Sequence, residues 1–132
     1  MAKPKKTPAA HAYREPVLRT NPMPSDCNAN GDIFGGWVLS QMDIAGGIVA
    51  SRRALGRCVT VAIDAMTFHR PIKVGDVVSL YADVTRVGRT SIAVKIDTLV
   101  RRRLDPHEIK VTEGTFVYVA IDAKGRPRAV PR

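Results

Sequence analysis

The stretch that decides the fold is residues 35–56, which read GGWVLSQMDIAGGIVASRRALG. Its apolar residues recur at the spacing i, i+4, i+7 and i+11, which gives one apolar stripe over three turns of an α-helix. The stripe consists of Val38, Met42, Ala45 and Val49. We therefore expect a long helix that begins at Gly35-Gly36 and ends near Gly56.

After this helix the sequence alternates between apolar and polar residues, which is the pattern of half-buried strands. The alternating stretches are 59–63, 78–84, 92–96 and 117–121, and a shorter strand is expected in 15–20, before the helix. The connections 71–76, 87–89 and 104–107 contain Gly, Pro or Asp and are interpreted as hairpin loops. A doubly wound parallel sheet would need a helix in nearly every crossover. The sequence thus predicts an α+β fold, with one long central helix wrapped by a curved five-stranded antiparallel sheet.

The composition is that of an ordinary globular domain, because 45% of the 132 residues are hydrophobic and 25% are charged. Residues 1–14 are basic, lack acidic residues and are rich in Pro and Ala. We expect a disordered tail there and a single domain at 15–132. Cys27 and Cys58 are too few for a disulfide framework or a zinc site, which favours free thiols and a cytoplasmic location. No stretch approaches the length of a transmembrane helix, so no membrane partner is expected.

The formal net charge is +9, from 21 Lys and Arg against 12 Asp and Glu. Such an excess suggests a polyanionic partner. A nucleic-acid-binding protein usually interleaves aromatic residues with its basic patches, and this chain has only three Phe, three Tyr and one Trp. Phosphate groups on a small ligand fit the excess equally well. We expect no nucleic-acid partner.

Asp43 lies off the apolar stripe of the predicted helix, on a face formed by small or aliphatic residues: Gly36, Leu39, Gly47 and Ala50. Another backbone or a ligand can approach the helix closely there. A sheltered carboxylate can activate a water molecule or attack a carbonyl carbon. The alternative is a solvated aspartate, which is common in the middle of helices.

The loop at 27–36, CNANGDIFGG, leads into the helix at Gly36 and Trp37. The start of a helix offers free backbone N–H groups and the positive end of its dipole, which can hold an oxyanion. Asp43 lies two turns further along the same side, about 10 Å by helix rise. The alternative is that Asn28, Asn30 and Asp32 only cap the helix and form turns.

A possible phosphate contact follows Gly88, where Arg89, Thr90 and Ser91 supply a cation and two hydroxyls. A solvated hairpin turn explains the same residues. None of the three histidines pairs with a serine, cysteine or acid in a known nucleophile motif, and the Gly-x-Ser-x-Gly motif is absent from the sequence. The sequence has no metal-binding cluster, so no metal is expected.

The segment 24–43, PSDCNANGDIFGGWVLSQMD, closely resembles the hotdog-fold acyl-CoA thioesterases, specifically the YciA-like group. The resemblance continues through 59–61, 66–68, 70–71, 74–78 and 116–120, and so covers nearly all of residues 17–131. It implies a helix wrapped by a five-stranded antiparallel sheet, an active site between two subunits, and a homodimer or a trimer of dimers.

The resemblance also implies roles for individual residues. The catalytic acid falls on Asp43, the N–H groups that polarise the thioester carbonyl fall on Gly36 and Trp37, and Asn28 is a polar loop residue near the site. The phosphates of CoA are implied to lie near Arg89, with Arg101 or Arg102 as further contacts. No separate cofactor is implied, because CoA is part of the substrate.

We therefore expect hydrolysis of acyl-CoA thioesters, with Asp43 as general base toward water or as nucleophile through a mixed anhydride. A hotdog hydratase or dehydratase is the alternative enzyme, but it would need a His partnered with an acid, and the predicted helix contains no His. A non-catalytic protein that binds acyl-CoA or nucleic acid through its positive surface is the alternative from another class.

Overall fold

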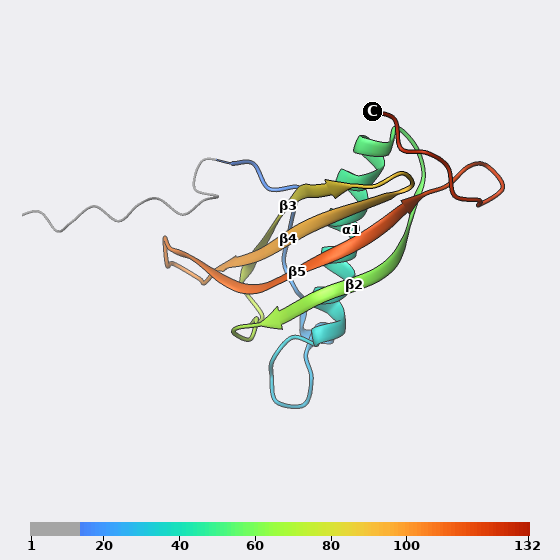
Figure 1. Ribbon diagram of the computed structural model, residues 1–132. Helices are drawn as coiled ribbons and strands as arrows, with labels where there is room; N and C mark the ends of the chain where they lie inside the picture. The colour runs from blue at the N-terminus through green and yellow to red at the C-terminus, as the bar shows by residue number, and fades with distance from the viewer. Residues whose placement is uncertain (1–13) are drawn as a thin grey trace, which may run out of the picture.

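Residues 14–132 are described by a computed structural model, in which helix α1 (Gly35–Ala54) lies against one face of a five-stranded antiparallel sheet (Figure 1). The strands are β1 (Leu18–Thr20), β2 (Cys58–Phe68), β3 (Val77–Val87), β4 (Ser91–Arg101) and β5 (Glu108–Ala120), and a short 3-10 helix spans Pro24–Asp26. The predicted α+β architecture is confirmed. The tail was predicted for residues 1–14, and all of it except Arg14 lies outside the described residues.

Helix α1 forms where the apolar stripe predicted it. Val38, Met42 and Ala45 are at most 3% exposed and pack on the sheet, where Ile92 and Ile96 of β4 are fully buried. The helix ends because Leu55 adopts a left-handed conformation (φ 55°), which lets the N–H of the next residue bond back to a carbonyl of the last turn. The stripe thus fixes which face of α1 packs on the centre of the sheet, and Asp43 lies beside this face, toward β2 and β5.

The strand order is β1-β3-β4-β5-β2, so β2 pairs with β5 and not with β3. The prediction of hairpin loops holds for β3–β4 and β4–β5 but is wrong for the connection between β2 and β3. That connection is a crossing segment with its own anchors. Ile72 is 2% exposed and its carbonyl accepts a hydrogen bond from the N–H of Ile33 (2.9 Å), while the Asp76 carboxylate accepts one from the N–H of Lys73 (2.9 Å).

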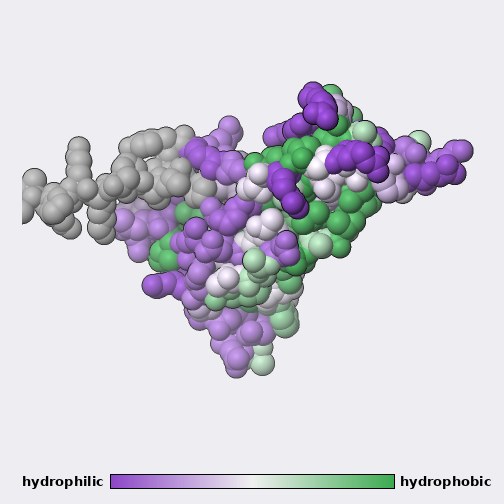
Figure 2. Space-filling view, in the orientation of Figure 1, coloured by the Kyte–Doolittle hydropathy of each residue, from purple (hydrophilic) through white to green (hydrophobic). Residues whose placement is uncertain are grey.

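Strand β2 is one edge of the sheet and carries exposed apolar side chains. Val59, Val61 and Ile63 are 41%, 54% and 48% exposed. On the face shown in Figure 2, hydrophobic residues gather over the region where β2 and β5 run side by side. An edge strand with this character is a natural place for another chain to pair.

Arg14, which the sequence analysis placed at the end of the tail, is attached to the sheet. Its guanidinium makes two hydrogen bonds to the carboxylate of Asp83 on β3 (2.8 and 3.1 Å) and lies 5.7 Å from the ring centroid of Tyr81. Cys27 and Cys58 are both free thiols. Within residues 14–132, no helix combines the length and the apolar character that are needed to cross a membrane.

Candidate active site

The carboxylate of Asp43 is held by two hydroxyl groups from the sheet. Its Oδ1 atom accepts hydrogen bonds from Thr60 Oγ1 on β2 (2.6 Å) and from the Tyr118 hydroxyl on β5 (3.1 Å). The Tyr118 hydroxyl also lies 3.1 Å from the backbone carbonyl of Asp43. Asp43 is partly buried. It is therefore an anchored carboxylate, and the alternative of an ordinary solvated aspartate does not fit.

Sheet register brings the two hydroxyls together, because Thr60 and Tyr118 are directly opposite each other on β2 and β5. Tyr118 is 2% exposed. Burial raises the pKa of its hydroxyl, and the negative charge of Asp43 raises it further. The phenol therefore keeps its proton at neutral pH and acts as a donor to the carboxylate.

The close approach of Tyr118 requires a glycine on α1. A Cβ atom added to Gly46 would lie 2.3 Å from the Tyr118 hydroxyl oxygen, whereas one added to Gly47 would lie 3.9 Å from the ring. The sequence analysis identified the small-residue face but assigned it to Gly47, and it missed Thr60 and Tyr118. The sequence signal pointed the other way, because the alternation in 117–121 indicates Val117 and Val119 as the inward residues, whereas the structure buries Phe116 and Tyr118.

The start of α1 offers fewer free donors than the sequence predicted. The N–H of Trp37 already donates to the carbonyl of Phe34 (3.1 Å). Within residues 14–132 the N–H of Gly36 has no such acceptor, and a Cβ atom added to Gly36 would meet nothing within 4 Å. Of the predicted pair, Gly36 is thus the open donor.

Asn28 organises the loop before α1. Its side-chain oxygen accepts hydrogen bonds from the N–H groups of Asn30 (2.9 Å) and Asp32 (3.1 Å). The turn-forming interpretation is therefore correct for this oxygen, whereas the capping interpretation is wrong, because Phe34 is the N-cap residue of α1 and no side chain caps the helix there. The side-chain amide of Asn28 is not used by these bonds, and it is separated from Asp43 by the first turns of α1.

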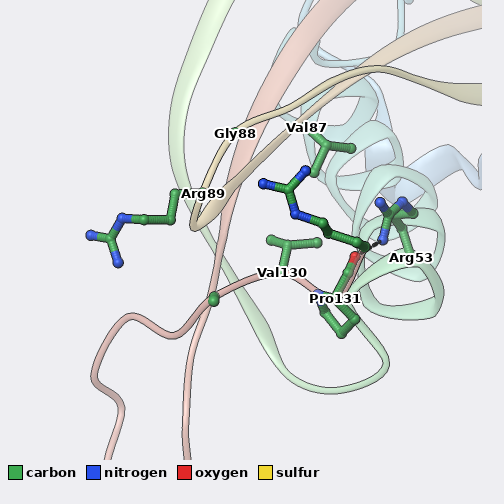
Figure 3. A pocket seen from close by; sticks show the side chains of 8 residues that line it. Arg53, Val87, Gly88, Arg89, Val130 and Pro131 are labelled. Carbon is green, nitrogen blue, oxygen red and sulfur yellow. Dashed lines mark hydrogen bonds between the residues drawn. The ribbon is translucent and has the colours of Figure 1, made fainter.

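A cavity of about 670 Å³ lies at the opposite end of α1 and is lined by Arg53, Arg89 and Arg132 together with Val87 and Pro131. Figure 3 shows Arg53 turned toward Pro131, whose carbonyl accepts its hydrogen bond (2.6 Å), while Arg89 extends outward from the β3–β4 loop. The backbone carbonyls of Thr90 and Ser91 accept hydrogen bonds from the N–H groups of Ala120 (2.9 Å) and Gly88 (2.8 Å). This loop is a tight, well-anchored hairpin turn beside a basic cavity.

Arg101 and Arg102 lie far from Arg89, contrary to the expectation that they share one phosphate site. Arg89 precedes β4 and Arg102 follows it, and a strand of 11 residues is about 34 Å long. Arg102 is also engaged locally, since it donates to the carbonyl of Pro71 (3.0 Å) and lies 3.8 Å from the carboxylate of Asp76. Within one chain these arginines cannot contact the same phosphate as Arg89.

Metal-ligating side chains are scattered over the described part of the chain, where no three of them are gathered in a way that could hold an ion. The expectation of a metal-free site stays a prediction.

One long helix against a curved antiparallel sheet is the hotdog fold, and a helix-borne carboxylate beside the sheet is the kind of site that a hotdog-fold thioesterase would use. A model of the thioesterase superfamily matches residues 30–99. The chain is 52% identical to the acyl-CoA thioester hydrolase YciA of Escherichia coli over 118 residues, which are 87% of this chain and 89% of the relative.

Solved structures agree. A hexameric thioesterase from Yersinia pestis superposes with a TM-score of 0.85 at 51% identity, covering 89% of this chain and 96% of that one. An Asp-to-Ala mutant of a hexameric, broad-specificity acyl-CoA thioesterase superposes with a TM-score of 0.86 at 49% identity, covering 89% of this chain and 87% of that one. The chain belongs to the thioesterase superfamily and, within it, to the YciA-like group of acyl-CoA thioester hydrolases.

Proposed function

We propose that this chain hydrolyses acyl-CoA thioesters to the free acid and CoA, and that Asp43 is the catalytic residue. The observation that carries the proposal is the anchored carboxylate of Asp43, which accepts hydrogen bonds from Thr60 and Tyr118 in a member of the thioesterase superfamily. The names of the relatives support the substrate class, because they are acyl-CoA thioester hydrolases.

Asp43 acts in one of two ways. As general base, it takes a proton from water while the water oxygen attacks the thioester carbonyl carbon; the C–S bond then breaks and the sulfur leaves as the CoA thiol after protonation. As nucleophile, a carboxylate oxygen attacks the same carbon and expels the thiolate, and water hydrolyses the resulting mixed anhydride. Label found in the carboxylate of Asp43 after a single turnover in ¹⁸O-labelled water would establish the anhydride route, because the general-base route places the label only in the product acid.

The carbonyl oxygen gains negative charge in either route, and the N–H of Gly36 at the positive end of α1 is the donor that we assign to it. The side-chain amide of Asn28 is a second donor in the preceding loop. Gly36 lies about 10 Å along the helix from Asp43. At this separation, Gly36 and Asp43 of the same chain do not reach one thioester carbonyl group together. We therefore assign each site to two subunits, with Asp43 from one and the loop with Asn28 and Gly36 from the other.

The phosphates of CoA occupy the basic cavity at the C-terminal end of α1, where Arg89 is a lining residue. Thr90 and Ser91 follow Arg89 in the chain but do not line this cavity. Arg53 lies ten residues after Asp43, about 15 Å along the helix. The pantetheine arm of CoA is an extended chain that separates its phosphates from the thioester, so a ligand bound at both places lies along α1. No separate cofactor takes part, because CoA belongs to the substrate.

The working unit is at least a dimer that pairs along β2, whose exposed edge carries Val59, Val61 and Ile63. Hexameric thioesterases are among the similar structures, which supports a trimer of such dimers. Pairing along β2 brings a second chain next to Thr60, and therefore next to the carboxylate of Asp43.

Substitution of Asp43 tests the proposed activity. Asp43→Asn should lower kcat for acyl-CoA hydrolysis at least about a hundredfold, the usual effect of losing a general base, while the oligomeric state is unchanged. The measurement is release of free CoA thiol under steady-state conditions. Asp83→Asn is the control, since Asp83 is an exposed β3 carboxylate paired with Arg14. Wild-type turnover by folded Asp43→Asn would exclude the mechanism.

A further inference from the structure

The hydroxyl group of Tyr118 is buried in the core side of the sheet, where an unbonded hydroxyl would be costly. Its single donor proton is shared between two acceptors of one residue, the side-chain oxygen and the backbone carbonyl of Asp43, each 3.1 Å from the phenolic oxygen. The polar part of this side chain is therefore directed at the proposed catalytic residue.

Packing does not explain the hydroxyl. The ring of Tyr118 stacks on Phe116, with centroids 6.5 Å apart and planes at 20°. A phenylalanine would fill the same space between these neighbours. The hydroxyl instead extends to the backbone of α1, and the helix accommodates it by having no side chain at Gly46. The missing side chain at Gly46 thus makes room for the hydroxyl of Tyr118, and also for Cδ1 of Ile96.

Thr60 makes the equivalent contact from the neighbouring strand. It is the register partner of Tyr118, and its hydroxyl donates to the same Oδ1 atom at 2.6 Å. Within residues 14–132 no hydrogen bond is found to the other oxygen, Oδ2. Two donors on one oxygen fix the rotamer of the carboxylate and leave its second oxygen available.

We propose that Tyr118 and Thr60 are positioning residues that clamp Oδ1 of Asp43, so that Oδ2 is the oxygen that acts on water or on the thioester carbonyl. This inference rests on the proposed function. Because the two hydroxyls act through the carboxylate, they contribute to the chemical step and not to binding of the substrate. Holding a reacting group within a fraction of an ångström is worth about one to two orders of magnitude in rate.

Removal of the Tyr118 hydroxyl is the first test. Tyr118→Phe should lower kcat about tenfold or more and change KM by less than about twofold, because only the orientation of Asp43 is lost. The matched control is Tyr81→Phe, which removes a hydroxyl from an equally buried tyrosine on β3 (2% exposed) and should keep both constants within about twofold of wild type. A raised KM with an unchanged kcat for Tyr118→Phe would overturn the assignment.

A double-mutant cycle shows whether the hydroxyl acts through the carboxylate. In the Asp43→Asn background, Tyr118→Phe should change the residual rate by less than about twofold. The same loss in both backgrounds would mean that Tyr118 acts independently of Asp43, and it would overturn the inference.

Thr60 provides a test that does not depend on the folding of a core variant. Thr60→Val keeps the shape but removes the hydroxyl and should also lower kcat about tenfold, whereas Thr60→Ser keeps a donor and should recover most of that loss. Inactive Asp43→Asn together with wild-type kcat for Tyr118→Phe and Thr60→Val would overturn the positioning role and leave the proposed function standing. Full activity of Asp43→Asn would instead remove the proposed function, and this inference with it.

Discussion

Gly46 and Gly47 are neighbours on α1 that the sequence does not distinguish, yet their surroundings differ. A Cβ atom at Gly46 would lie 2.3 Å from the Tyr118 hydroxyl oxygen and 2.8 Å from Ile96 Cδ1. At Gly47 the nearest such atom is 3.9 Å away, which is ordinary van der Waals contact. One glycine is therefore required by the site, and the other is a helix residue with room for a methyl group.

This difference predicts opposite effects of the same substitution. Gly46→Ala should destabilise the protein by about 1–3 kcal/mol, because the helix and sheet must move apart, and it should lower kcat by displacing Tyr118. Gly47→Ala should be neutral or stabilising by up to about 1 kcal/mol, because alanine is the better helix former. Chemical denaturation of the two variants checks this prediction. Equal stability of the two would contradict the close contact at Gly46.

At this scale, the sequence predicted Asp43 but not the residues that hold it. Helix periodicity places Asp43 off the apolar stripe, and this depends only on residues close to it in the chain. Thr60 and Tyr118 meet Asp43 through the pairing of β2 with β5, which local periodicity does not specify. The structure also corrects the predicted role of Trp37 as a free donor, because its N–H already donates to the carbonyl of Phe34 in the first helical turn.

Among the elements, the long helix and the two central hairpins could be predicted because each depends on contiguous residues. The position of β2 could not, because alternation shows that a stretch is a strand but not which strand it pairs with. The crossing segment 69–76 resembles a turn in its Pro and Gly content. Its role becomes clear only from contacts such as the buried Ile72.

The length of β4 leads to a prediction about its two ends. Arg89 lies before β4 beside the basic cavity, whereas Arg101 is the last residue of the strand, at the far end of the sheet. If CoA phosphates bind at the cavity, Arg89→Ala should raise KM for acyl-CoA several-fold and weaken its salt dependence, with kcat nearly unchanged. Arg101→Ala should leave KM within about twofold of wild type.

Steady-state kinetics at low and moderate salt on these two variants is the measurement. The pair is well matched, because both substitutions remove one exposed arginine and change the net charge equally. A larger effect on KM from Arg101→Ala than from Arg89→Ala would place the phosphates at the other end of β4, and our assignment of the cavity would then be wrong.

Two features of the whole molecule bear on its partners. Its net charge is +9, and one edge of its sheet is an 11-residue strand, β2, with three large exposed apolar side chains. An exposed apolar edge strand tends to associate, and proteins that stay monomeric usually protect such edges with charge or proline. The hydrogen bond from Thr60 on this strand to Asp43 connects assembly with the proposed active site.

A charge at the edge of β2 should therefore disturb assembly and activity together. Val61 is 54% exposed and lies at an irregularity in the β2–β5 register, so Val61→Lys adds a charge with little effect on the core. We expect a smaller particle by light scattering and a lower kcat/KM, because burying a lysine between paired strands is unfavourable.

Leu104→Lys is the control, since Leu104 is fully exposed in the β4–β5 turn, and it should keep the wild-type mass. A wild-type protein that is monomeric at micromolar concentration, or a Val61→Lys variant of unchanged mass, would contradict pairing along β2. Loss of mass with full activity would show instead that each protomer contains a complete site.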